Sequence, residues 1–159
     1  MLRLIDIVDR RAILPVLQSS QRDDVIMEMV NALVQAGVVP QVQREELVGK
    51  VLERERKGST GFGRGVAVPH VKHKNITKMV AAVGVSARGI DFNALDTQPV
   101  YSVFLLLSPE DRPEQHLQAM EAIFKNLSKD TFRRFLRQAA SADDVWTLLE
   151  EADAASPGA

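Results

Sequence analysis

The chain has 159 residues, of which 45% are hydrophobic and 26% are charged, as expected for one globular domain that buries its own core. The formal net charge of −1 gives no overall basic field, so neither nucleic acid nor an anionic membrane is an expected partner. Cysteine is absent, which excludes disulfides, thiolate chemistry and cysteine-ligated zinc.

The sequence also lacks the patterns of membrane and secreted proteins. No apolar run reaches the ~18 residues that a transmembrane helix needs. Residues 1–11 (MLRLIDIVDRR) have only a short apolar stretch, which Asp6, Asp9 and Arg10 interrupt, and this is not a secretory signal. We therefore expect a cytoplasmic protein without membrane insertion.

Helical hydrophobic periodicity marks the first part of the chain. Apolar residues at helical spacing predict a helix over residues 22–36, and Gly37 follows it as a stop signal. A second stripe of the same period predicts a helix over residues 41–57, which Gly58 closes. The chain thus begins its predicted structure with two amphipathic helices.

Three apolar segments predict strands in the middle of the chain. The first is the short run 66–68, the second is 79–85, and the third is 100–107, which is rich in β-forming residues. The last two do not alternate with polar residues, so we expect central strands that are buried on both faces. Residues 86–96 contain turn-forming residues and are expected to connect these two strands.

The last third of the chain is predicted to be helical. Residues 113–127 carry a strong apolar stripe, and Pro113 suits the first turn of a helix. A second helix is predicted over residues 131–137, and Ser141 and Asp144 have the spacing of a capping box that begins a third. Helices, then strands, then helices indicate a single α/β domain with a mixed β-sheet flanked by helices.

A glycine-rich segment, residues 58–73 (GSTGFGRGVAVPHVKH), contains the first candidate functional residue, His70. Gly63 and Gly65 leave backbone N–H groups uncovered, and such groups can cradle a phosphate or let a partner approach. The segment is not a P-loop, because the Gly-Lys-Ser/Thr ending is absent. The residues alone leave open whether His70 packs in the core, binds a metal or takes part in chemistry.

Two further candidates lie outside this segment. His116 falls in the first turn of the predicted helix over residues 113–127, at the edge of its apolar stripe, where it can reach a cleft. Arg54 belongs to the run ERER, most of which is expected to be a solvated helix end. Arg54 itself lies three residues after Val51 and can face inward. For both candidates, the alternative is a helix-surface residue without a functional role.

His70 and His73 form an HxxH pair, with Lys72 and Lys74 beside it. Two histidines do not make a metal site, because zinc usually takes three or four convergent ligands. No carboxylate lies within residues 66–78, so we expect no metal here. The lysines and histidines instead favour an acidic partner or a phosphate, or else they form a solvated loop.

These segments resemble a known family over most of the chain. Residues 52–70 (LERERKGSTGFGRGVAVPH) resemble the segment before the phosphorylated histidine of the fructose/mannitol-type enzyme IIA domains of the bacterial phosphoenolpyruvate-dependent sugar phosphotransferase system. This group includes the nitrogen-regulatory IIA proteins. Residues 89–110 resemble the family's stretch between two strands, and residues 114–149 resemble its C-terminal helices. The resemblance implies a IIA-type domain over residues 1–152, and we expect a flexible tail over residues 153–159.

The resemblance also assigns roles to individual residues. His70 matches the family's phosphoryl-accepting histidine, His116 its second active-site histidine, and Arg54 an arginine near the site. Such a site needs no metal and no bound cofactor, and backbone N–H groups around the glycines of the loop are expected to help. Val71 stands where the family often has glycine or another small residue, and His73 matches no family role.

The function implied is that of a phosphocarrier protein, a phosphotransferase component that accepts a phosphoryl group from phosphohistidine on the small carrier protein HPr. It would pass the group on or use it as a regulatory signal. Two alternatives remain open. One is a sugar-transport IIA component that delivers phosphate to a IIB domain, and the other is a non-catalytic module of the same fold that binds a regulatory target protein.

Overall fold

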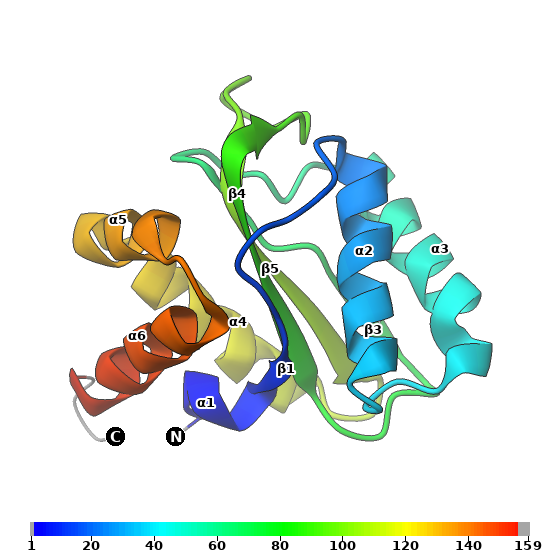
Figure 1. The fold of residues 1–159 in the computed structure, drawn as a ribbon. Helices are drawn as coiled ribbons and strands as arrows, with labels where there is room; N and C mark the ends of the chain where they lie inside the picture. The colour runs from blue at the N-terminus through cyan, green and yellow to red at the C-terminus, as the bar shows by residue number, and fades with distance from the viewer. Residues whose placement is uncertain (1, 156–159) are drawn as a thin grey trace.

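The computed structural model describes residues 2–155, which form six α-helices, one 3-10 helix and five strands (Figure 1). Helices α2 and α3 cover one face of the sheet, and α4, α5 and α6 lie on the other. In chain order the elements are α1 (Leu4–Ile7), β1 (Val8–Leu14), α2 (Arg22–Gln35), η1 (Gln41–Gln43), α3 (Arg44–Lys57), β2 (Val66–Ala67), β3 (His70–His73), β4 (Val80–Ile90), β5 (Val100–Pro109), α4 (Pro113–Leu127), α5 (Asp130–Gln138) and α6 (Ala142–Ala155).

The sheet is mixed, which confirms the predicted fold class. Its order is β1-β4-β5-β2, and β3 also pairs with β5. The β4–β5 pair is antiparallel, whereas β1 with β4, β2 with β5 and β3 with β5 are parallel. Val66 pairs with Ser102 and His70 with Leu106, so β2 and β3 follow one another along the same edge of β5.

Strand β5 separates two hydrophobic clusters. Val103 and Leu105 belong to the cluster under α2 and α3, while Phe104 and Leu106 belong to the cluster under α4, α5 and α6. Alternate side chains of a strand point to opposite faces, so both faces of β5 are buried against helices. The expectation of a central strand buried on both faces is confirmed for β5.

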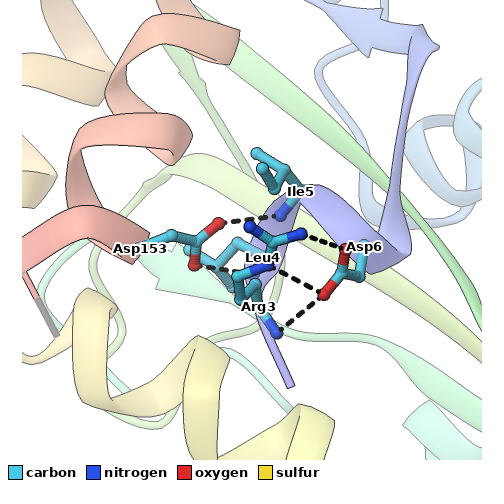
Figure 2. Close-up of polar contacts among 5 residues, drawn as sticks. All are labelled: Arg3, Leu4, Ile5, Asp6 and Asp153. Atoms are coloured by element: carbon cyan, nitrogen blue, oxygen red, sulfur yellow. Dashed lines mark hydrogen bonds and ion pairs between the residues drawn. The ribbon is translucent and has the colours of Figure 1, made fainter. Parts of the chain in front are cut away.

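The N-terminal elements α1 and β1 were not expected from the sequence. Strand β1 has charged, exposed residues in its middle and pairs in parallel with β4 at the edge of the sheet. Helix α1 is fixed by the far end of the chain, because Asp153 is buried and its carboxylate accepts hydrogen bonds from the backbone N–H groups of Leu4 (2.8 Å) and Ile5 (3.0 Å) (Figure 2). These N–H groups have no partner within the helix, and Asp153 supplies one.

The C-terminal ends of two elements differ from the sequence-based expectations. Strand β4 continues to Ile90, so part of the expected connection 86–96 is strand, with a register irregularity between Val85 and Ile90. Helix α6 extends to Ala155, so the first three residues of the expected tail 153–159 are helical. The rest of that tail lies outside the described residues. Within residues 2–155, no helix combines the length and the apolar character that crossing a membrane requires.

Candidate functional site

Three predicted residues meet at the edge of the sheet where β3 lies. His70 is the first residue of β3, His116 is in the first turn of α4, and Arg54 is in the last turn of α3. Pairing of His70 with Leu106 places it near the end of β5, and α4 starts shortly after that end. As a result, the His70 and His116 rings lie 5.5 Å apart between centroids, tilted by 45°.

The hydrogen bond of His70 defines its tautomer. Nδ1 of His70 lies 2.8 Å from the backbone oxygen of Val68. A carbonyl oxygen can only accept, so Nδ1 carries the proton and Nε2 keeps a free lone pair. Burial lowers the pKa of His70, and the charges of Arg54 and Lys72 lower it further, although the bond to Val68 acts in the opposite direction. The ring is therefore neutral at neutral pH.

His116 is oriented by a buried hydroxyl. Its Nδ1 lies 2.7 Å from Oγ of Ser108, which is fully buried near the end of β5. When the hydroxyl donates to Nδ1, the imidazole proton resides on Nε2. Burial, with smaller contributions from His70 and Lys72, lowers the pKa of His116 to about 4. Without a bound anion, His116 is thus a neutral N–H donor and not a cation.

Arg54 supplies the permanent charge of the site. Its Nη1 donates to the backbone oxygen of Gly58 (2.9 Å), just past the end of α3, which fixes the side chain close to its own helix. No other partner of this guanidinium occurs among the described residues, so its remaining N–H groups are available to an anion. Arg54 and His70 line the same cleft, and the charge of Arg54 lowers the pKa of His70.

These side chains share one open cleft of about 410 Å³. The cleft spans the β3 edge of the sheet, between α3 on one side and the start of α4 on the other. Its four cations outnumber its single carboxylate, Glu53, which pairs with Lys50 at 3.7 Å. The cleft therefore attracts anions. Its lining residues are Lys50, Glu53, Arg54, Lys57, His70, Val71, Lys72 and His116.

The structure does not bring Gly63 and Gly65 to this cleft. Gly65 instead accepts hydrogen bonds from the N–H groups of Tyr101 (2.8 Å) and Ser102 (3.1 Å) at the start of β5. That position precedes Leu106, the partner of His70, by about 13–17 Å along the strand. Both glycines have positive φ, +118° and +77°, so their local role is to turn the chain before β2.

His73 does not join His70. Side chains three positions apart on a strand point to opposite faces, and His73 is buried on the side of α3. Its Nδ1 accepts from the backbone N–H of Asn75 (3.0 Å), and its Nε2 lies 3.5 Å from a carboxylate oxygen of Glu46. Of the HxxH pair, His70 therefore lines the cleft, whereas His73 makes structural contacts.

Sequence reasoning missed Ser108 and the lysines of α3. Ser108 follows a long buried run and contacts a histidine eight positions later, a pairing that only the turn from β5 into α4 creates. Lys50 and Lys57 could have been found, because they lie four positions before and three after Arg54 on the same helix face.

Comparison with known proteins identifies the family. The family described as "Phosphoenolpyruvate-dependent sugar phosphotransferase system, EIIA 2" matches residues 6–152. The match covers most of the chain, so the protein belongs to this family of IIA domains, as the sequence resemblance indicated.

Relatives of two kinds share the family. The "PTS system fructose-specific EIIABC component" of Bacillus subtilis (strain 168) is 30% identical over 96% of this chain, which corresponds to only 24% of that longer protein. A "Nitrogen regulatory protein" of Bradyrhizobium diazoefficiens is 34% identical, covering 91% of this chain and 92% of the relative.

Solved structures confirm the fold. The crystal structure of nitrogen regulatory protein IIA-Ntr from Neisseria meningitidis has a TM-score of 0.82 at 26% identity, covering 91% of this chain and 97% of that one. A chain in the complex of enzyme IIAMTL and phosphorylated enzyme IIBMTL from Escherichia coli has a TM-score of 0.74 at 21% identity, covering 89% of this chain and 95% of that one. The second likeness is one of fold alone.

Proposed function

We propose that the protein is a phosphocarrier, in which Nε2 of His70 accepts a phosphoryl group from a phosphohistidine donor and later passes it on. The observation that carries this proposal is the 2.8 Å hydrogen bond between His70 Nδ1 and Val68, which leaves the lone pair on Nε2. The lowered pKa of His70 keeps that lone pair free of a proton at neutral pH. Membership of the IIA family supports the same chemistry.

The transfer exchanges one N–P bond for another. The lone pair of His70 Nε2 attacks phosphorus, and the N–P bond of the donor breaks with its electron pair returning to the donor's ring nitrogen. No proton is needed in this exchange, and onward transfer to an acceptor repeats it with His70 as the leaving group. Catalysis of such a step rests on positioning and on stabilising the charge of the phosphoryl oxygens.

His116 and Arg54 would stabilise those oxygens in different ways. His116 donates through Nε2–H when Ser108 holds its Nδ1. The arriving phosphoryl group is negatively charged, so it raises the pKa of His116 from about 4 and strengthens the hydrogen bond. Arg54 needs no such change, since a guanidinium is always charged at physiological pH.

The test is phosphorylation by phosphoenolpyruvate, enzyme I and HPr from a source proven competent on another IIA protein. The wild type is expected to gain one acid-labile phosphate, and His70→Ala is expected to gain none. The chain has three histidines, so His73→Gln is a matched control that should still be labelled. An unlabelled wild type, or a labelled His70→Ala variant, would contradict the proposal.

We further propose that the phosphoryl group serves regulation, with the donor an HPr-like protein and the acceptor or target another protein. The 34% identity to a nitrogen regulatory protein over 91% of this chain, together with the likeness to IIA-Ntr (26% identity), supports the regulatory use. Sugar transport is the second candidate, favoured by the fructose-specific relative. Rapid transfer from the phosphorylated protein to a fructose- or mannitol-type IIB domain would favour transport, whereas a stable phosphoprotein under those conditions would favour regulation.

A further inference from the structure

A second hollow, of about 580 Å³, lies against helix α5 and the start of β5. Its lining residues are Arg64, Asp130, Arg133, Arg134, Arg137 and Gln138, none of which lines the histidine cleft. Arg137 lies over the ring of Tyr101, with its guanidinium carbon 3.6 Å from the ring centroid. Tyr101 is separated from Leu106, the partner of His70, by about 17 Å along β5. The two basic sites are thus distinct.

The hollow is lined by four arginines and one aspartate. That carboxylate, Asp130, is largely exposed and already contacts Arg133 (3.4 Å) and Arg134 (3.6 Å). Among residues 2–155, no carboxylate forms an ion pair with the side chain of Arg64 or Arg137. Positive charge therefore exceeds negative charge in the hollow, and it is not neutralised by the described residues.

Two of these arginine side chains are held by specific contacts, and a third arginine has a constrained backbone. Arg133 has a side chain only 15% exposed, and its Nη1 donates to the backbone oxygen of Leu127 (2.8 Å). Arg137 is stacked on Tyr101. The backbone of Arg64 is left-handed (φ 61°), and its N–H lies 3.3 Å from a carboxylate oxygen of Asp96. Like charges held together by such contacts form a preorganised anion site.

We propose that this hollow binds an anion with two or more phosphoryl groups, either an inorganic oligophosphate or the phosphate tail of a nucleotide. The planar guanidinium fork matches phosphate oxygens in a bidentate manner, and the charge of four arginines, less that of Asp130, exceeds what a single phosphate balances. The volume falls within the range of small-ligand pockets, roughly 300–1,000 Å³. Binding in this hollow would not involve the phosphotransfer chemistry of the histidine cleft.

Titration calorimetry of the whole protein with inorganic tripolyphosphate, without metal ions and at low salt, tests the proposal. We expect saturable binding that weakens as salt rises. Because a hydrogen bond to a charged group contributes strongly, Arg137→Gln should lower the affinity about tenfold or more. Arg56→Gln removes the same charge from an exposed position outside both sites and should leave the affinity unchanged.

Additional ligands and variants complete the test. Orthophosphate is expected to bind at least about tenfold more weakly, since it can engage fewer of the guanidinium groups. Tighter binding of ATP than of tripolyphosphate would identify a nucleotide as the ligand, and equal binding would identify the phosphate chain alone; both results support the proposal. The proposal is overturned if tripolyphosphate does not bind or if Arg54→Gln abolishes binding while Arg137→Gln does not. It is also overturned if a glutamate-rich peptide of equal charge binds as tightly.

Discussion

The histidine cleft and the arginine hollow are both basic sites beside β5, but they differ in the kind of charge they hold. In the cleft, burial lowers the pKa of His70 and of His116, so the reactive rings are neutral. In the hollow, every cation is a guanidinium, which does not lose its proton. A group that must form and break a bond to phosphorus needs a free lone pair, whereas a group that only holds an anion does not. The difference separates the proposed transfer site from the proposed binding site.

The largest expected effect after loss of His70 itself concerns His116. His116→Ala should slow phosphoryl transfer by about 10²–10³-fold, as for removal of one preorganised donor at a developing charge. Phosphate should still reach His70, only more slowly. His116 is half-buried, so thermal unfolding should change little. Rapid-quench kinetics of transfer from phospho-HPr measure the effect, and an unchanged rate per folded molecule would make His116 a packing residue.

Comparing two variants, Arg54→Gln in the cleft and Arg137→Gln in the hollow, separates the roles of the two sites. Arg54→Gln should slow transfer about tenfold or more, since it removes a charged donor from the cleft, while Arg137→Gln should leave transfer unchanged. Binding of tripolyphosphate should show the reverse dependence. Measuring both properties on both variants checks this, and parallel losses in the two assays would mean that the sites are not independent.

Ser108 should have a smaller effect, exerted through His116. Ser108→Ala removes one neutral hydrogen bond and should slow transfer about two- to tenfold. Because His116 would lose the partner that fixes its tautomer, NMR of its ring nitrogens should show a changed proton distribution. Ser108→Thr retains the hydroxyl and is the matched control. A slower Ser108→Ala variant with unaltered His116 nitrogen signals would point to a packing defect instead.

The smallest effect is on stability as a function of pH. The folded-state pKa of His116, about 4, lies below its usual value of 6.5, so the unfolded chain binds more protons between these values. Stability should therefore rise with pH across roughly pH 4 to 6.5 and be lost as pH falls through that window. Denaturant melts of the wild type and His116→Gln test this, and the variant should show a shallower slope. Equal slopes would contradict a buried neutral His116.

Patterns of hydrophobicity predicted the interior elements well, but of the edge strands they predicted only β2. The helix over residues 113–127 and the buried strand β5 have continuous local signals, and both were found. Strand β1 has charged residues in its middle, and β3 (HVKH) shows no alternation of apolar and polar residues. These edge strands are specified by the strand with which each one pairs. Such pairing is not local information, so these strands were missed.

The candidate site residues also divide into those that local motifs indicate and those that only the fold brings together. His70, His116 and Arg54 were selected from motifs, and the structure brings them to one cleft. Gly63 and Gly65 were expected to help hold the phosphoryl group, but neither lines the cleft, and their positive φ values belong to the turn before β2. The arginine hollow was not predicted, since Arg64 joins the α5 arginines only through tertiary contact.

In the proposed function, Nε2 of His70 carries the phosphoryl group. Long-range ¹H–¹⁵N correlation NMR of the protein, phosphorylated by phosphoenolpyruvate, enzyme I and HPr, tests it most directly. We predict that phosphorus couples to Nε2 of His70 and that Nδ1 keeps its proton, which it donates to the backbone oxygen of Val68. Phosphorus on Nδ1 of His70, or on His73 or His116, would contradict it.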